Sequence, residues 1–193
     1  MPDSGSSMPM SSADTATVMD FDEALARRAG RGDARAFERL YREHVGRVHG
    51  LCLRMARDAA AAEDCTQEAF IRAWRALPRF EARSSFGTWL HRIAVNVVLE
   101  RRRVPTREEP LPPDPDALGE LSWVFDTPVE LAEIETAVAA LPDGARDALV
   151  LCALYGYTSV EAGEMLGLAA GTCKAQLHRA RQLLASRLNR GIV

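Results

Sequence analysis

A proline-rich acidic stretch in the middle of the chain divides it into two parts. The segment VPTREEPLPPDPDALGELSWVFDTP, residues 104–128, holds six of the ten prolines and has no helical period. Proline lacks a backbone donor and clashes inside helices, so such a run forms neither helix nor sheet. We therefore expect a flexible linker at 104–128 between two small domains, one at 21–103 and the other at 129–193.

The periodic segments on both sides of this linker are helical. Apolar residues recur every three or four positions, and no alternation typical of strands appears. Before the linker we expect helices at 33–57 and 60–77 and a third that begins at Ser84 or Ser85, with Asp33 as the first N-cap. After it we expect helices at 129–141, 142–154 and 158–166, then a turn at Gly167 and a last long helix. The expected fold class is all-α.

The N-terminal segment MPDSGSSMPMSSADTATVMD has neither a basic start nor an apolar centre. It is therefore no secretory signal, and we expect a disordered tail at 1–20. The chain contains no run of eighteen apolar residues, so we expect no transmembrane helix and no direct insertion into a membrane.

The four cysteines are Cys52, Cys65, Cys152 and Cys173. They form no CxxC pair, and no histidine follows them at the spacing of zinc ligands. We interpret them as small buried hydrophobic residues of a protein in the reducing cytoplasm. A redox pair of Cys152 and Cys173 remains as an alternative.

Charge is segregated along the chain, although the net charge is only −3. Residues 83–103 carry five arginines and one glutamate, and residues 165–193 carry five basic residues and no acidic one. Between these regions, residues 104–135 carry nine acidic residues and one arginine. Such asymmetry indicates two basic interaction surfaces joined by an acidic connector.

The final helix, within LGLAAGTCKAQLHRARQLLASRL, has an apolar face and a basic face. A solvated basic face is the simplest interpretation of one such helix. Insertion into a membrane surface would require large aromatic side chains, and the helix has none. A capped short helix, a turn at Gly167 and this basic helix together form a helix-turn-helix, which favours DNA binding.

Two blocks of sequence carry a family resemblance. EDCTQEAFIRAWRALPRF with SSFGTWLHRIAVNVVLERRR, and LPDGARDALVLCALYGYTSVEAGEMLGLAAGTCKAQLHRARQLL, strongly resemble the sigma factors of bacterial RNA polymerase, specifically the extracytoplasmic-function (ECF) group of the sigma-70 family. The resemblance covers residues 22–188, with both family domains in their usual order. In this chain Cys173 and Ala175 stand where the family commonly has valine and serine.

The resemblance implies three binding surfaces, whose residues match the family motifs. Binding to core RNA polymerase is implied for Asp64, Gln67, Glu68, Phe70 and Trp74. Recognition and melting of the −10 element are implied for Phe80, Arg83, Ser84, Ser85, Phe86, Arg92 and Asn96. Recognition of the −35 element is implied for Gly171, Thr172, Lys174, Ala175, His178, Arg179 and Arg181. We interpret Trp89, beside the −10 set, as a core residue.

The partners expected from this resemblance are core RNA polymerase and promoter DNA. A further one is an anti-sigma factor, which in many relatives is anchored in the membrane. We expect no cofactor, no metal and no catalytic residue, because nucleotide addition belongs to the polymerase. Two other functions explain the sequence less well. A stand-alone helix-turn-helix regulator would leave residues 64–103 unexplained, and an enzyme or metal sensor would need converging histidines, cysteines or carboxylates.

Overall fold

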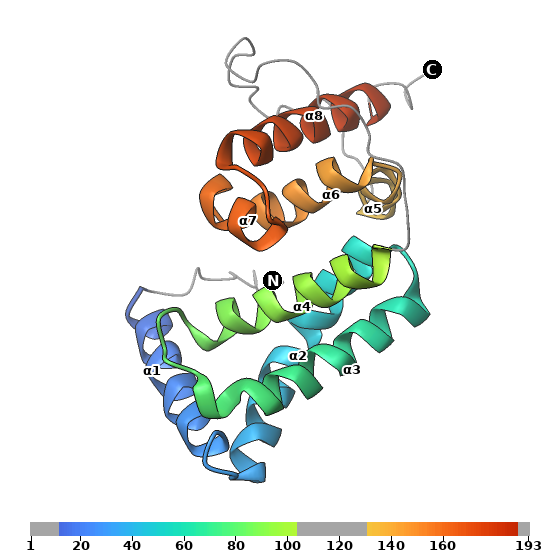
Figure 1. The fold of residues 1–193 in the computed structure, drawn as a ribbon. Coiled ribbons are helices and arrows are strands. Elements are labelled where there is room, and N and C mark those ends of the chain that lie inside the picture. Colours follow the sequence, from blue (N-terminus) through green and yellow to red (C-terminus); the bar gives the residue numbers. More distant parts are fainter. Residues whose placement is uncertain (1–11, 104–130, 189–193) are drawn as a thin grey trace, which may run out of the picture.

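The computed structural model describes residues 12–103 and 131–188, all of whose regular structure is helical (Figure 1). The prediction of an all-α fold is confirmed. The linker expected at 104–128 lies outside the described residues, as do residues 1–11 of the expected tail.

The first domain consists of four α-helices and one short 3₁₀ helix. These are α1 (Ser12–Ala29), α2 (Ala34–Ala56), α3 (Ala59–Ala76), the 3₁₀ turn (Leu77–Arg79) and α4 (Phe86–Arg102). The sequence did not predict α1, which begins inside the segment 1–20 that was expected to be disordered. It packs against α2 and ends before Gly32, a glycine with a φ of 95°.

Polar caps begin three of these helices. The carboxylate of Asp33 accepts hydrogen bonds from the backbone N–H groups of Arg35 and Ala36, both at 3.1 Å, and thus caps α2 as predicted. Asp58 caps α3 through the N–H of Ala61. Of the two serines considered for α4, Ser85 is the cap, because its hydroxyl accepts from the N–H of Thr88.

The core of the first domain lies between α2, α3 and α4. Leu40 and Leu51 from α2 and Phe86 and Leu90 from α4 are fully buried, and Phe70 of α3 is nearly so. Each such side chain stabilises the fold by about 1.5–3 kcal/mol through removal of apolar surface from water. This packing holds α3 and the start of α4 rigidly, and both carry predicted site residues.

The second domain is a smaller helical cluster. Its elements are α5 (Leu131–Ala139), α6 (Asp143–Leu149), a π-helical turn (Val150–Leu154), α7 (Ser159–Leu166) and α8 (Ala170–Leu188). Along α8, Cys173, Leu177, Ala180 and Leu184 are buried, which confirms the predicted apolar face of this helix. The two domains are in contact, with α4 of the first lying against α7 of the second (Figure 1).

Candidate polymerase-binding and DNA-binding surfaces

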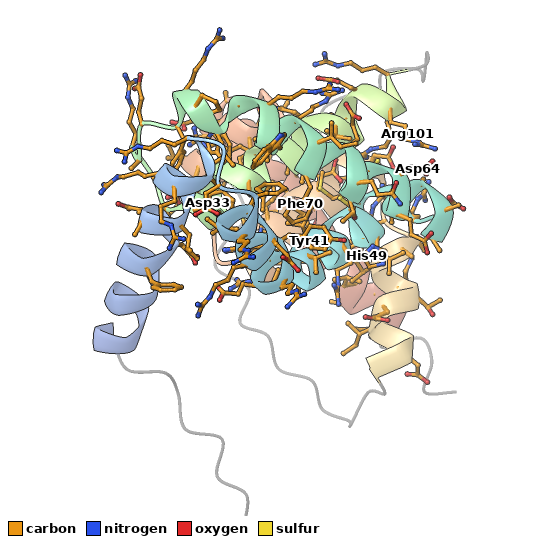
Figure 2. All side chains as sticks on the ribbon, turned by 90° about the horizontal axis from the view of Figure 1, so that it is seen from below. Asp33, Tyr41, His49, Asp64, Phe70 and Arg101 are labelled. Atoms are coloured by element: carbon orange, nitrogen blue, oxygen red, sulfur yellow. The ribbon has the colours of Figure 1, made fainter. Side chains whose placement is uncertain are left out.

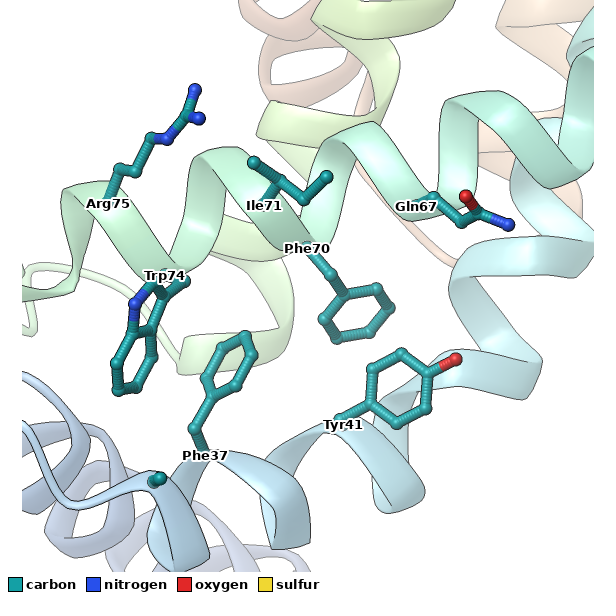
Figure 3. A pocket seen from close by; sticks show the side chains of 8 residues that line it. Phe37, Tyr41, Gln67, Phe70, Ile71, Trp74 and Arg75 are labelled. Carbon is teal, nitrogen blue, oxygen red and sulfur yellow. The ribbon is translucent and has the colours of Figure 1, made fainter.

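An apolar groove lies between α2 and α3 of the first domain (Figure 3). It has a volume of about 610 Å³, and we call it the α2–α3 groove. Its lining residues are Ala34, Phe37, Tyr41, Gln67, Phe70, Ile71, Trp74 and Arg75. The large side chains of Tyr41, Ile71 and Trp74 remain 41%, 45% and 37% exposed. A contiguous exposed apolar surface of this kind marks a site for a partner protein.

Aromatic rings from both helices form the floor and wall of the groove. The ring of Phe37 lies 4.8 Å from that of Trp74, and the ring of Tyr41 lies 4.7 Å from that of Phe70. Phe70 is buried beneath the others, so it supports the groove and does not project from it. In Figure 2, drawn from below, Tyr41 and Phe70 lie on the face turned away from the second domain.

The predicted polymerase-binding residues divide into two sets. Gln67, Phe70 and Trp74 line the groove, whereas Asp64 and Glu68 are not among its lining residues. Asp64 accepts a hydrogen bond from Arg101 of α4 at 2.9 Å, and Glu68 accepts one from Arg72 at 2.7 Å. These carboxylates raise the pKa of both arginines. The pairs are largely exposed, so they are weak enough for a charged partner to displace.

A second, smaller pocket is formed by the loop before α4 and the first turns of that helix. It has a volume of about 230 Å³, and we call it the α4 loop pocket. Its lining residues are Arg79, Phe80, Glu81, Ala82, Arg83, Ser84, Trp89 and Arg92. The rings of Phe80 and Trp89 lie 5.0 Å apart. Ala82 has a φ of 54°, a left-handed conformation that strains a residue with a Cβ atom.

Four of the seven residues predicted for the −10 element line this pocket, namely Phe80, Arg83, Ser84 and Arg92. Two of the others act within the fold: the hydroxyl of Ser85 caps α4, and the fully buried Phe86 packs under Phe80 with ring centroids 6.0 Å apart. The last, Asn96, is exposed on α4 one turn beyond Arg92 and is not a lining residue. Trp89 packs on the core and also lines the pocket, so its interpretation as a core residue was incomplete.

Two local features define the start and the end of α7, the first helix of the helix-turn-helix in the second domain. Thr158 and Glu161 form a reciprocal capping box at the start of α7. Gly167 ends α7 with a φ of 71°, a conformation that glycine adopts without strain. A Cβ atom at Gly163 would lie 2.9 Å from the carbonyl oxygen of Leu168, so glycine there permits a close approach of the turn to α7.

The residues predicted for the −35 element lie between Gly171 and Arg181, in the N-terminal part of α8. Gly171 and Lys174 are exposed, and Thr172, His178, Arg179 and Arg181 are half-buried. Ala175 is only 8% exposed, so its methyl group is not presented to a partner in this arrangement. Lys174, His178 and Arg181 follow one another at helical spacing and therefore share one side of α8.

The four cysteines carry free thiols. Burial raises the pKa of Cys52 to about 11, which makes that thiol inert. A hydrogen bond between the thiols of Cys152 and Cys173 lowers the pKa of Cys152 to about 7 and raises that of Cys173. The two thiols are thus neighbours, with Cys152 half-buried and Cys173 buried.

Among residues 12–103 and 131–188, no three histidine, cysteine or carboxylate side chains converge in a way that could hold a metal ion. Over the same ranges, no helix is long and apolar enough to cross a membrane.

Comparisons with known proteins agree with both halves of this arrangement. The family "Sigma-70 region 2" matches residues 40–108, and "Sigma-70, region 4" matches residues 131–184. The RNA polymerase sigma-H factor of Pseudomonas aeruginosa is 32% identical over 179 residues, which cover 84% of this chain and 91% of that protein. The ECF RNA polymerase sigma factor SigM of Mycobacterium tuberculosis is 35% identical over 160 residues, or 80% of this chain and 78% of the relative.

A solved structure is also similar over both domains. The complex of CnrH with the cytosolic domain of CnrY contains a chain that superposes with a TM-score of 0.64 at 27% identity, covering 89% of this chain and 99% of that one. The family regions, the relatives and this structure lead to one conclusion: the chain belongs to the ECF group of the sigma-70 family of RNA polymerase sigma factors.

Proposed function

We propose that this chain is an alternative sigma factor that binds core RNA polymerase, recognises the −35 and −10 elements of promoters and melts the DNA. The observation that carries the proposal is the presence of both family regions in one chain, each with its own surface. The first region holds an apolar groove and an aromatic pocket, and the second holds a helix-turn-helix. In this proposal the polymerase, and not this chain, catalyses nucleotide addition. The chain would act in the cytoplasm, where the polymerase and the chromosome are.

The α2–α3 groove is the proposed binding site for core polymerase. Its exposed Trp74, Ile71 and Tyr41 offer apolar area, while Gln67 and Arg75 supply polar contacts at its edge. An apolar groove between two helices fits a helix of the partner, whose apolar side chains would enter between α2 and α3. Asp64 and Glu68 of the same helix α3 add acidic charge, which suits a partner helix with basic residues on its flank.

The α4 loop pocket is the proposed site for an unpaired base of the −10 element. The faces of Phe80 and Trp89 can stack on a base, and the guanidinium groups of Arg83 and Arg92 can neutralise the phosphates beside it. A base must leave the duplex to reach such a pocket, so binding there favours the melted state of the DNA. Asn96 is exposed one turn further along α4 and is proposed to contact the same strand.

The start of α8 is the proposed reader of the −35 element. Lys174, His178 and Arg179 would meet base edges in the major groove, and Arg181 would meet a phosphate. The backbone N–H groups around Gly171 and Thr172 would face the DNA backbone at the N-terminus of the helix.

An anti-sigma factor is the further proposed partner. CnrH, whose structure is similar to this one over both domains, was solved bound to the cytosolic domain of CnrY. We expect a protein that binds this chain in the same way.

Reconstituted transcription tests the proposal. The purified chain, added to core polymerase that lacks any sigma factor, should direct transcripts to start at defined sites on genomic fragments. Trp74→Ala should lower its affinity for core polymerase at least tenfold, since tryptophans at interface centres contribute about 2 kcal/mol or more. Leu53→Ala is the matched control, because Leu53 is an exposed apolar residue of α2 that does not line the groove. A chain that bound DNA tightly alone and left the polymerase unaffected would be a stand-alone regulator instead.

A further inference from the structure

Cys152 lies in the π-helical turn that follows α6. The backbone N–H of Tyr155 donates to the carbonyl oxygen of Val150 at 3.1 Å, which is the hydrogen bond of a π-helix. Turns of this kind are rare, and they occur frequently at functional sites. Within the turn Val150 and Leu151 are buried and Leu154 is exposed, while Cys152 between them is half-buried. Its thiol therefore lies where the core of the second domain meets solvent.

A second thiol reaches the same place from α8. Cys173 lies at the start of that helix and is fully buried. A hydrogen bond joins its thiol to that of Cys152, so two free sulfurs meet between the π-helical turn and α8. The whole of α7 separates the two cysteines in the sequence, so it is the fold of the helix-turn-helix that brings them together.

The surroundings of Cys152 favour a thiolate at this position. The thiol of Cys173 donates to its sulfur, and the side chain of Ser159, the first residue of α7, also hydrogen-bonds to it. The positive charge of Arg181, about two turns along α8 from Cys173, acts in the same direction. These contacts, with Cys173 contributing most, lower the pKa of the Cys152 thiol although burial opposes them. Cysteines beside helix N-termini and arginines are the ones that react.

The other two cysteines have the opposite character. Cys52 on α2 and Cys65 on α3 are buried in the core of the first domain, and burial raises the pKa of both thiols. A protonated and enclosed thiol reacts slowly with an oxidant. One chain thus holds two thiols arranged for oxidation in its second domain, and two inert thiols in its first domain that serve as an internal control.

We propose that Cys152 and Cys173 form an oxidation site, at which hydrogen peroxide converts the two thiols to a disulfide between the π-helical turn and α8. The sulfur of Cys152 attacks one oxygen of the peroxide. A sulfur–oxygen bond forms, the oxygen–oxygen bond breaks, and the leaving hydroxide takes a proton to become water, which leaves a sulfenic acid on Cys152. The sulfur of Cys173 then attacks that of Cys152. The disulfide forms, the sulfur–oxygen bond breaks, and the second water leaves with the proton of the Cys173 thiol. The thiols lose two electrons, and the peroxide gains them.

The exposure of each thiol fits its part in this sequence. The half-buried Cys152 can meet the oxidant, whereas the buried Cys173 can meet only the sulfur of Cys152. Because the two thiols are already in contact, the disulfide can form before a second peroxide oxidises the sulfenic acid further. Disulfides in a reducing cytoplasm are transient and typical of redox sensing, so a cellular dithiol would restore the reduced pair.

The disulfide would change the surface proposed to read the −35 element. Cys173 lies between Thr172 and Lys174, which are both in the −35 set. A disulfide bond is about 2.05 Å long, which is shorter than the contact between two thiols. Its formation therefore draws the first turn of α8 toward the π-helical turn and displaces Thr172 and Lys174 relative to α7. We expect the oxidised chain to bind a −35 duplex more weakly, a consequence that rests on the proposed function.

Peptide mapping of the full chain tests the oxidation site. Trypsin releases both cysteines on one peptide, residues 147–174, because the only lysine or arginine in this range is its last residue. After treatment with a small excess of hydrogen peroxide and alkylation of the remaining thiols, this peptide should lack two hydrogens and carry no alkyl group. Cleavage at Glu161 and Glu164, which lie between the cysteines, should leave two halves that separate only on reduction. The other two cysteines should be alkylated. Equal oxidation of all four thiols, or a disulfide that joins two chains, would overturn the proposal.

Two variants separate the parts of the cysteines. Cys173→Ser leaves Cys152 without a thiol to condense with, so a sulfenic acid should accumulate there and react with dimedone. Cys152→Ser should form at least tenfold less of this adduct at Cys173, because that thiol is buried and its pKa is raised by the hydrogen bond and by burial. If Cys173→Ser loses helical content by circular dichroism, Cys173→Val, which is close in volume and apolar, replaces it. Equal adducts in the two variants would overturn the assignment.

Fluorescence anisotropy with a −35 duplex tests the consequence for α8. The oxidised wild type should bind about fivefold or more weakly than the reduced one, as expected for the loss of one base contact, and dithiothreitol should restore the affinity. Cys152→Ser, treated identically with peroxide, is the matched control and should bind as the reduced wild type does. An oxidised chain of verified mass that bound as tightly as the reduced chain would overturn the effect on α8. Failure of the reduced chain to bind would instead refute the proposed −35 function, and the mapped disulfide would be unaffected.

Discussion

The α4 loop pocket and the start of α8 are both proposed to bind DNA, yet they present different types of side chain. The pocket is a hollow with two aromatic rings, Phe80 and Trp89, and arginines at its edge. The helix α8 has no phenylalanine, tyrosine or tryptophan and presents Lys174, His178 and Arg179 along its first turns. Flat rings fit the faces of unpaired bases, whereas long polar side chains fit the edges of paired ones. The contrast fits the proposal that the pocket binds an unpaired strand of the promoter and that α8 binds its duplex.

The two surfaces are also supported differently. The pocket is held by Phe86 from the buried core and by a loop with left-handed backbone at Ala82. The residues proposed to contact DNA on α8 lie on one regular helix, which packs on α7 and α6. Substitutions in the pocket should therefore change the melting step, while substitutions on α8 should change binding to the duplex.

The largest effect is expected from Phe80→Ala. Loss of stacking on one base costs about 1–3 kcal/mol, so open complexes should form roughly five- to 150-fold more slowly. Affinity for a −35 duplex should not change. Permanganate reactivity of unpaired thymines on a linear promoter measures the rate, and Phe80→Tyr, which keeps the ring, is the control. If the alanine variant opened promoter DNA at the wild-type rate, the pocket would have no role in melting, and the proposed difference between the two surfaces would be wrong.

The next effect is expected from Arg179→Ala on α8. A bidentate contact with a base edge is worth about 1–3 kcal/mol of discrimination, so the variant should bind the best −35 duplex more weakly by that amount. It should bind a scrambled duplex about as well as wild type does. Fluorescence anisotropy with both duplexes measures the difference, and an equal loss on both would show that Arg179 contacts only the backbone.

Local features of the chain were predictable because they depend on near neighbours in sequence. The caps at Asp33 and Thr158, the turn at Gly167 and the buried face of α8 all follow from spacing and side-chain chemistry. The same spacing placed Phe80, Arg83 and Arg92 near one another, because they lie within a short loop and the first turns of one helix. Family resemblance supplied their proposed roles.

Features that depend on packing between distant segments were not predictable. Phe37 and Tyr41 of the α2–α3 groove belong to α2. The spacing of apolar residues in α2 predicts that one side of the helix is buried, but it does not identify the helix that packs against that side. The contact between the domains joins residues as far apart as Arg47 and Tyr155. Helix α1 was missed because its N-terminal half has the composition of a polar tail.

A smaller effect is expected from Arg181→Ala, which tests the charge of α8 apart from its specificity. Removal of one phosphate contact should weaken binding to matched and scrambled duplexes by the same factor. Log affinity falls as log salt concentration rises, and the substitution should make this slope less steep by about one. A salt titration on both duplexes measures this slope, and a loss confined to the matched duplex would assign Arg181 to a base edge.

The smallest effect is expected from Ala82→Gly in the pocket. A left-handed φ costs a residue with a Cβ atom about 1–2 kcal/mol, and glycine removes that strain at an entropic cost of about 0.4–1 kcal/mol. The variant should therefore be more stable to urea by a few tenths to about 1 kcal/mol. The freer loop should hold Phe80 and Arg83 less firmly, so single-stranded −10 DNA should bind about twofold more weakly. Ala185→Gly, inside the regular helix α8, is the matched control and should destabilise the chain by about 0.5–1 kcal/mol. If Ala82→Gly stabilises the chain and Ala185→Gly destabilises it, the backbone is strained at the pocket and unstrained in α8. If both substitutions lower the free energy of unfolding equally, the loop is unstrained, and the two surfaces differ only in their side chains.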